Sequence, residues 1–133
     1  PAARQKGLAV HLDVPPDAPR LVTDPEKVRQ ILVNLGANAV KFTDEGSITL
    51  AVRRDDGHAR FSVRDTGVGI PAHAHALVFE PFTQLDAGLA RRHGGVGLGL
   101  YIASRLAGLL RGRLELRSAE GEGSEFELVL PAE

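Results

Sequence analysis

Four polar side chains recur at helical spacing in the first third of the chain. They are Gln30, Asn34, Asn38 and Lys41. At about 100° per residue they fall within roughly 80° of one another, beside the apolar face of a predicted helix. An amide oxygen is a hard, neutral ligand that suits Mg²⁺, and a lysine ammonium can meet a phosphate as a point charge. The alternative interpretation is an ordinary solvated helix face.

The segment D-T-G-V-G-I at 65–70 combines a carboxylate with two glycines. In the alternating strand that ends here, Asp65 shares a face with Val63, so its side chain should point toward the interior. A buried carboxylate is costly unless it is hydrogen-bonded, and a purine amino group is one partner that would satisfy it. Gly67 and Gly69 would let the backbone turn sharply and approach a ligand closely. The alternative is an aspartate that caps a glycine turn.

A third motif, G-G-V-G-L-G-L at 94–100, opens a predicted helix. Gly95, Gly97 and Gly99 would expose backbone N–H groups at the helix N-terminus, where the dipole favours an anion. The motif is neither a P-loop nor a dinucleotide fingerprint, because no G-K-[ST] follows it and no strand of a βαβ unit precedes it. Alone this motif is weak evidence for an anion site, but here it follows the polar helix residues and the D-T-G-V-G-I segment.

The motif F-E-P-F at 79–82 precedes a polar segment at 84–93 that holds Arg91 and Arg92. The two phenylalanines could anchor the end of a mobile loop, or they could simply fill core. The polar segment could be a lid over phosphates or a surface loop.

The strands that would position these residues follow from alternating hydrophobicity. The pattern predicts strands at 8–12, 47–54, 58–65, 113–119 and 125–131. The second and third form a hairpin around the turn at 55–57, and the last two pair around 120–123. Hairpins with segregated helices indicate an α+β fold, in which helices pack on one face of a mostly antiparallel sheet.

Two amphipathic helices complete the predicted fold. The first begins with Asp24 as N-cap and Pro25 in the first helical position, and it ends at D-E-G. Its apolar face is Val28, Ile31, Leu32, Leu35, Ala39 and Phe42. The second runs from Gly97 to about Leu110. Its apolar face is predicted as Leu98, Ile102, Leu106 and Leu109. A short helical stretch is expected near 74–78.

Composition narrows the class of protein. The 133 residues predict one domain, and 43% apolar with 25% charged residues is typical of a globular protein. A formal charge of −1 argues against nucleic acid held by bulk charge. The chain contains no cysteine, which excludes disulfides and thiolate zinc sites, and no run approaches the ~20 apolar residues of a membrane span. We expect a soluble piece of a longer protein.

The four motifs occur in one order that resembles a known family. NLGANAVKFT, DTGVGI, FEPFTQ and GGVGLGL are similar to the N box, first glycine box, F box and second glycine box of the sensor histidine kinases. The resemblance runs from about Lys6 to Pro131. It implies the Bergerat ATP-binding fold, a two-layer α/β sandwich shared with gyrase-type topoisomerases, heat-shock ATPase chaperones and mismatch-repair ATPases.

The resemblance also implies roles for individual residues. Asn38 would be the Mg²⁺ ligand, Asn34 and Lys41 would act near the phosphates, and Asp65 would receive the adenine amino group. A lid would run from about Gln84 to Gly94. The other residues implied to line the nucleotide are Phe42, Gly67, Gly69, Ile70, Phe82, Arg92, Gly95, Gly97, Leu98, Gly99 and Ser124.

Position 34 separates kinase from ATPase within this resemblance. ATPase relatives carry a glutamate there that activates water, whereas Asn34 is an amide that cannot accept a proton at neutral pH. The nucleophile should then be a histidine imidazole, which needs positioning more than activation. None of the five histidines here follows the family's phosphoacceptor pattern, so the acceptor would lie on an upstream dimerisation domain that is absent.

We therefore expect a single domain, 1–133, that transfers the ATP γ-phosphoryl to that histidine. The resemblance implies a response regulator as downstream partner and a homodimeric, cytoplasmic parent, with a membrane anchor elsewhere in the parent left open. Two alternatives remain: a Bergerat-fold ATPase, and a degenerate nucleotide-binding or scaffolding module. Arg111-Gly112 replaces the family's usual Gly-Gly and is expected to alter only a surface turn.

Overall fold

The computed structural model describes residues 7–14, 23–43, 45–75, 77–79, 99–119 and 121–131. The strands are β1 (Ala9–Asp13), β2 (Ser47–Asp55), β3 (His58–Asp65), β4 (Arg113–Ser118) and β5 (Ser124–Pro131). The helices are α2 (Pro25–Lys41) and α4 (Gly99–Leu109), with 3₁₀ turns η1 (Ala72–Ala74) and η2 (Leu77–Phe79). Within these ranges, no helix is long and apolar enough to cross a membrane.

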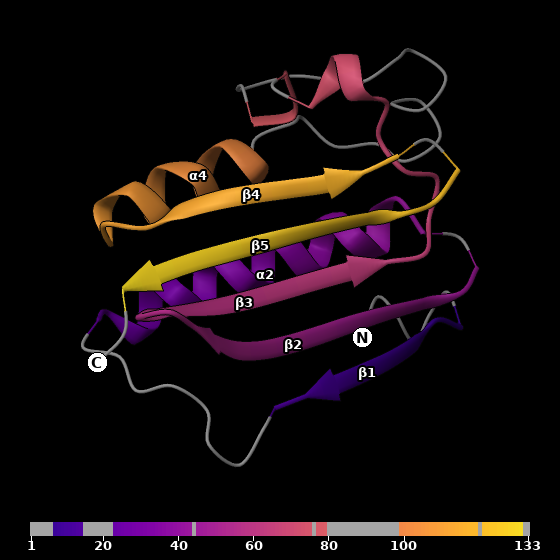
Figure 1. The fold of residues 1–133 in the computed structure, drawn as a ribbon. Helices are drawn as coiled ribbons and strands as arrows, with labels where there is room; N and C mark the ends of the chain where they lie inside the picture. The colour runs from indigo at the N-terminus through magenta and orange to yellow at the C-terminus, as the bar shows by residue number, and fades with distance from the viewer. Residues whose placement is uncertain are drawn as a thin grey trace.

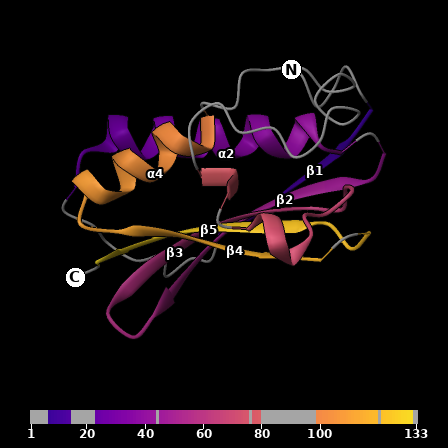
Figure 2. The same cartoon turned by 90° about the horizontal axis from the view of Figure 1, so that it is seen from above.

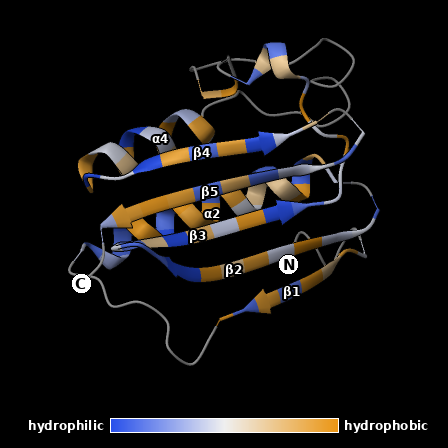
Figure 3. Cartoon of the chain, in the orientation of Figure 1, coloured by the Kyte–Doolittle hydropathy of each residue, from blue (hydrophilic) through white to orange (hydrophobic). Residues whose placement is uncertain are grey.

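The strands form one mixed sheet in the order β1-β2-β3-β5-β4 (Figure 1). β1 pairs with β2 in parallel, and the remaining neighbours are antiparallel. Hydrophobic and hydrophilic residues alternate along β3 and β4 (Figure 3), so each strand gives one face to the core and one to solvent. The predicted strands, their hairpins and the mostly antiparallel sheet are confirmed.

Both helices lie on one face of this sheet, side by side (Figure 2). α2 contributes Ile31, Leu35 and Ala39 to the core, and all three are buried. They belong to the same core cluster as Phe126 and Leu128 of β5. The two-layer α+β architecture predicted from the sequence is therefore confirmed.

The N-terminus of α2 follows the predicted cap. The carboxylate oxygen Oδ1 of Asp24 accepts the backbone N–H groups of Glu26 at 3.0 Å and Lys27 at 3.2 Å, and Pro25 is the first helical residue. This satisfies donors that the first turn of a helix leaves without intrahelical partners. The cap therefore fixes where α2 begins.

The apolar face predicted for the second helix is only partly correct: Leu106 is partly buried and packs against the core, but the other two described members are exposed. Ile102 is 40% exposed and Leu109 is 70% exposed, whereas the buried side chains of α4 are Leu100, Ala103 and Ala107. Both stripes have helical spacing, so periodicity alone cannot choose between them. The stripe with two alanines faces inward because small side chains let the helix approach its neighbours closely. Leu98 lies outside the described residues.

The short helical stretch expected near 74–78 is instead the pair of 3₁₀ turns η1 and η2. Phe79, at the end of η2, packs edge-to-face on Phe126 with the ring centroids 5.9 Å apart. One phenylalanine of the F-E-P-F motif therefore fills core, as one of the two interpretations predicted. The other, Phe82, lies outside the described residues.

The C-terminus of α4 has a Schellman motif with an arginine where glycine is usual. The N–H of Gly112 donates to the carbonyl of Ala107 at 2.9 Å, and the N–H of Arg111 donates to that of Gly108 at 3.1 Å. Arg111 has φ of +64°, the left-handed conformation that side chains with a Cβ disfavour. The expected surface turn is thus also a strained one.

We expect Arg111→Gly to raise the free energy of unfolding by about 1 kcal/mol, because glycine adopts this conformation without the Cβ clash. The matched control is Arg105→Gly, at an exposed position inside α4. There the same change should lower stability by about 1 kcal/mol. Urea unfolding of both variants checks the opposite signs, and equal destabilisation would contradict the strain at Arg111.

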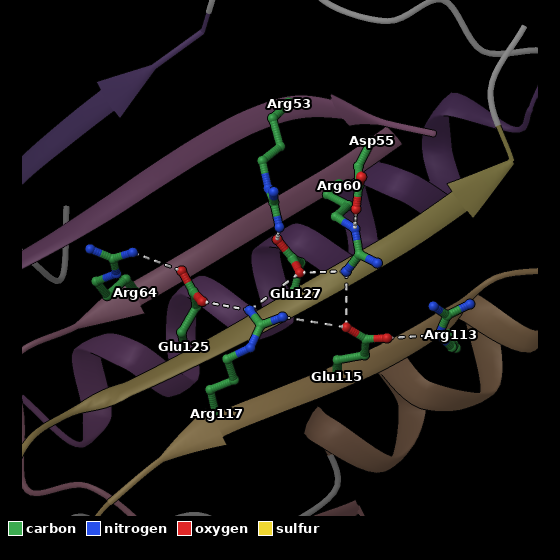
Figure 4. Close-up of polar contacts among 9 residues, drawn as sticks. All are labelled: Arg53, Asp55, Arg60, Arg64, Arg113, Glu115, Arg117, Glu125 and Glu127. Carbon is green, nitrogen blue, oxygen red and sulfur yellow. Dashed lines mark hydrogen bonds and ion pairs between the residues drawn. The ribbon is translucent and has the colours of Figure 1, made fainter. Parts of the chain in front are cut away.

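The sheet face turned away from the helices carries a network of arginines and carboxylates (Figure 4). Its members are Arg53, Asp55, Arg60, Arg64, Arg113, Glu115, Arg117, Glu125 and Glu127. They alternate with the core-facing residues of β2, β3, β4 and β5. Glu127 is only 2% exposed, although it lies on this outer face. The face is therefore a charged layer on the side of the sheet opposite the helices.

Candidate functional site

Asp65 is a predicted site residue whose charged side chain the structure buries. It ends β3, is 5% exposed, and its Oδ1 accepts the backbone N–H groups of Gly67 at 2.9 Å and Ser124 at 3.2 Å. Burial raises the pKa of this carboxyl, while the hydrogen bonds from Gly67, Ser124 and the Thr43 side chain lower it to a smaller extent. Asp65 therefore both points inward and caps the glycine turn, so the two interpretations of the motif are compatible.

The loop after Asp65 lies against the C-terminal end of α2. The N–H of Val68 donates to the carbonyl of Phe42 at 3.3 Å. A Cβ on Gly67 would collide with that same carbonyl, and one on Gly69, whose φ is +75°, would collide with the carbonyl of Ala119. The close approach that these glycines allow is to the chain's own backbone. Their contact with a ligand stays a prediction.

Two hydroxyl groups join this loop to the turn between β4 and β5. The Ser118 Oγ accepts the N–H of Ile70 at 2.7 Å and donates to the carbonyl of Gly123 at 2.8 Å. The single hydroxyl proton of Ser118 is used in the bond to Gly123. The Ser124 hydroxyl therefore donates to the Ser118 Oγ, 2.8 Å away. Ser124 and Ile70 were predicted site residues, and the structure brings them together with Asp65.

Sequence reasoning missed Ser118 and Thr43 as parts of this arrangement. Ser118 lies opposite Ser124 in the β4–β5 pairing, so the hairpin register was a signal that could have found it. Thr43 is fully buried just after α2 and forms a hydrogen bond with Asp65. Its position two residues after Lys41 gave no periodic signal, because the helix has already ended there.

The polar edge of α2 reaches α4 through one hydrogen-bonded chain. The Gln30 side-chain amide donates to the Oδ1 of Asn34 at 3.1 Å, and the Nδ2 of Asn34 donates to the carbonyl of Gly99 at 3.2 Å. Gly99 is the first residue of α4. The structure therefore places Asn34 at the junction of the two helices.

Farther along the same edge, Asn38 and Lys41 are half-buried. The Lys41 ammonium lies 5.4 Å from the centre of the Phe42 ring, within range of a cation–π contact. An α-helix rises about 1.5 Å per residue, so Asn34 and Phe42 are separated by roughly 12 Å along the axis. The second half of α2 thus reaches from the start of α4 to the loop that follows Asp65.

The predicted site residues consequently fall into three groups. Phe42, Asp65, Gly67, Gly69, Ile70 and Ser124 gather where β3 ends and β5 begins. Asn34 and Gly99 meet at the helix junction, with Asn38 and Lys41 on the same helix. The remaining five, Phe82, Arg92, Gly95, Gly97 and Leu98, lie outside the described residues.

Comparison with known proteins gives the family of the chain. Residues 23–133 match the family described as "Histidine kinase-, DNA gyrase B-, and HSP90-like ATPase". The chain is 41% identical over 132 residues to the sensor histidine kinase RcsC of Escherichia coli, covering 98% of this chain and 14% of that protein. It is 45% identical over 109 residues to the circadian input-output histidine kinase CikA of Synechococcus elongatus, covering 81% of this chain and 14% of that protein.

Solved structures agree with this assignment. The full-length ShkA crystallised in complex with AMPPNP matches with a TM-score of 0.88 and 39% identity, over 99% of this chain and 27% of that one. The mycobacterial sensor histidine kinase MprB matches with a TM-score of 0.80 and 26% identity, over 98% and 86%. The chain belongs to the histidine kinase-, DNA gyrase B- and HSP90-like ATPase family, as the motifs indicated.

Proposed function

We propose that this chain is the ATP-binding catalytic domain of a sensor histidine kinase and transfers the γ-phosphoryl of ATP to a histidine on a separate domain. The observation that carries the proposal is the buried Asp65 carboxylate, held by two backbone N–H groups where β3, the glycine loop and β5 meet. The names of RcsC and CikA and the AMPPNP bound to ShkA support it.

Asp65 would recognise adenine. A carboxylate whose Oδ1 already accepts two N–H groups keeps acceptor capacity for the exocyclic amino group of a purine. A guanine presents a carbonyl at that place, and a carbonyl would repel the carboxylate. Ser124 and Ile70 flank Asp65 and would line the base, with Gly67 and Gly69 shaping the loop around it.

Asn38 and Lys41 would hold the phosphate end. The described residues contain no group of three or more histidine, cysteine, aspartate or glutamate side chains that could cage a metal ion. Mg²⁺ suits such a site, because it commonly takes few protein ligands and keeps phosphate and water oxygens. The Asn38 amide oxygen would bind the ion, and the ion would neutralise phosphate charge. Phe42, Gly99, Phe82, Arg92, Gly95, Gly97 and Leu98 complete the proposed lining.

The amide at position 34 favours a kinase over a hydrolase. It cannot accept a proton from water at neutral pH, and its oxygen already accepts a hydrogen bond from Gln30. We therefore infer that the acceptor is a histidine of a dimerisation domain and that a response regulator receives the phosphoryl group next. The curated relatives span far more than this chain, which covers 14% of RcsC. A homodimeric parent is part of the same proposal.

A fluorescent ATP analogue should bind this chain, and EDTA should weaken that binding. Asn38→Ala is expected to reduce the affinity measured with Mg²⁺ by about tenfold and to leave the weaker, metal-free binding unchanged, because it removes a metal ligand. Val33→Ala, at an exposed position of the same helix, is the matched control and should bind like the wild type.

Three outcomes would overturn parts of this proposal. An absence of affinity at millimolar ATP would identify a degenerate module. Brisk Mg²⁺-dependent hydrolysis by the chain alone would favour an ATPase over a kinase. Equal losses with and without Mg²⁺ in Asn38→Ala would remove the metal role of that residue.

A further inference from the structure

Two side-chain amides and one backbone carbonyl form a directed chain between the helices. Gln30 donates to Asn34 at 3.1 Å, and Asn34 donates to the Gly99 carbonyl at 3.2 Å. Gln30 and Asn34 are one turn apart on α2, whereas Gly99 is 65 positions farther along the sequence from Asn34. The hydrogen-bonded chain thus joins a contact within α2 to a contact between α2 and α4.

The direction of each hydrogen bond is determined by chemistry. A backbone carbonyl can only accept, so the NH₂ group of Asn34 must face Gly99. The oxygen of Asn34 then faces the other way, where only a donor can satisfy it. The NH₂ group of Gln30 supplies that donor, and a glutamate of the same shape could not when ionised.

We propose that Gln30 is a positioning residue, which fixes the amide of Asn34 and thereby holds the start of α4 against α2. The inference rests on the proposed function, because α2 carries Asn38 and Lys41 while the start of α4 would offer backbone N–H groups to phosphates. One chain of hydrogen bonds then fixes the positions of α2 and of the start of α4, which would form two sides of the triphosphate site. Gln30 itself does not touch the substrate.

The same hydrogen-bonded chain gives a structural reason for an amide at position 34. A carboxylate there would place an acceptor against the Gly99 carbonyl, so two acceptors would face each other. Asparagine at position 34 therefore cannot act as the base that a hydrolase needs. Its NH₂ group also provides the donor that holds the start of α4 against α2. The identity of residue 34 is coupled to that of residue 30, since each fixes the polarity of the other.

The decisive variant is Gln30→Glu, which keeps the shape of the side chain and removes the donor. Asn34 would turn its NH₂ group toward the new carboxylate and its oxygen toward Gly99, and the tie to α4 would be lost. We expect about fivefold weaker binding of ATP and unchanged binding of adenosine, both followed by NMR titration. Gln30→Ala should show the same split. Val33→Glu adds the same charge at an exposed position beside Asn34 but outside the hydrogen-bonded chain. This variant should retain wild-type affinity for ATP.

Amide hydrogen exchange without nucleotide tests the contact itself. The amides of residues 103–107, the first whose carbonyl acceptors lie within α4, should exchange faster in Gln30→Glu than in the wild type. Wild-type exchange and wild-type ATP affinity in both Gln30 variants would overturn the inference. So would equal losses for ATP and adenosine, or a loss in Val33→Glu as large as in Gln30→Glu. A wild-type chain that binds no ATP would instead overturn the proposed function, with the exchange result still deciding the contact.

Discussion

Replacing Asp65 with asparagine is expected to weaken binding of an ATP analogue by about 100-fold while leaving the chain folded. The asparagine oxygen can still accept the N–H groups of Gly67 and Ser124, so these two backbone hydrogen bonds are retained. Its NH₂ group would then occupy the place of the second carboxylate oxygen and oppose the adenine amino group. Losing a charged hydrogen bond and leaving two donors in conflict costs about 2.7 kcal/mol, which is 100-fold in affinity.

Asp56→Asn is the matched control for this substitution. Asp56 lies in the β2–β3 turn with φ of +47°, a conformation that asparagine also tolerates. The turn is at the other end of β3 from Asp65. Titration with a fluorescent ATP analogue should show wild-type affinity for the control. Wild-type affinity in Asp65→Asn would remove the adenine role of this carboxylate.

The pH dependence of Asp65 has a definite sign. Burial raises the pKa of its carboxyl in the folded chain above the value in the unfolded chain. Between these two values the folded state binds more protons, so the contribution of Asp65 to stability falls as pH rises through that window. Asp65→Asn should flatten this part of the stability profile and give no loss of stability at neutral pH. A lower free energy of unfolding at neutral pH would show that the charge itself stabilises the fold.

Much of the fold was predictable because its signals are local. The cap at Asp24 and the alternation in the hairpins depend on neighbouring residues, and the structure confirms both. The inward direction of Asp65 followed from the two-residue period of its strand. The face of α4 was not predictable in this way, because Ile102 and Leu100 belong to two stripes of equal period. Only contact with α2 and the sheet selects one of them.

The hydrogen bonds of the site were harder to predict than its residues. The motifs named Asn34, Asp65 and Ser124, but not the groups that orient them. The donor to Asp65 from Ser124 is 59 positions away, and the acceptor for Asn34 is 65 positions away. Such partners are determined by how the elements pack, and a single sequence does not encode that packing in any local pattern.

The outer sheet face gives the second large expected effect. Glu127 is 2% exposed, and the closest cation to it is Arg60, whose Nη1 lies 2.8 Å from its Oε1. Arg60 is itself 14% exposed and also contacts Asp55 at 2.8 Å and Glu115 at 2.9 Å. The hydrogen bonds that Arg60 donates to Glu127 and then to Glu115 raise the pKa of its guanidinium, so it stays charged at any relevant pH. The two residues are unequal partners, since Arg60 has other carboxylates while Glu127 depends mainly on Arg60.

We therefore expect Arg60→Leu to lower the free energy of unfolding by about 3 kcal/mol, because it leaves the Glu127 charge buried with only the longer contacts to Arg53 and Arg117. Glu127→Leu should cost less than half as much, because Arg60 keeps Asp55 and Glu115. The double variant should lie within about 1 kcal/mol of the wild type, since no uncompensated buried charge remains. Urea unfolding of the three variants measures this asymmetry. Equal losses for the two single variants, or additive losses in the double variant, would mean that packing and not charge compensation stabilises this face.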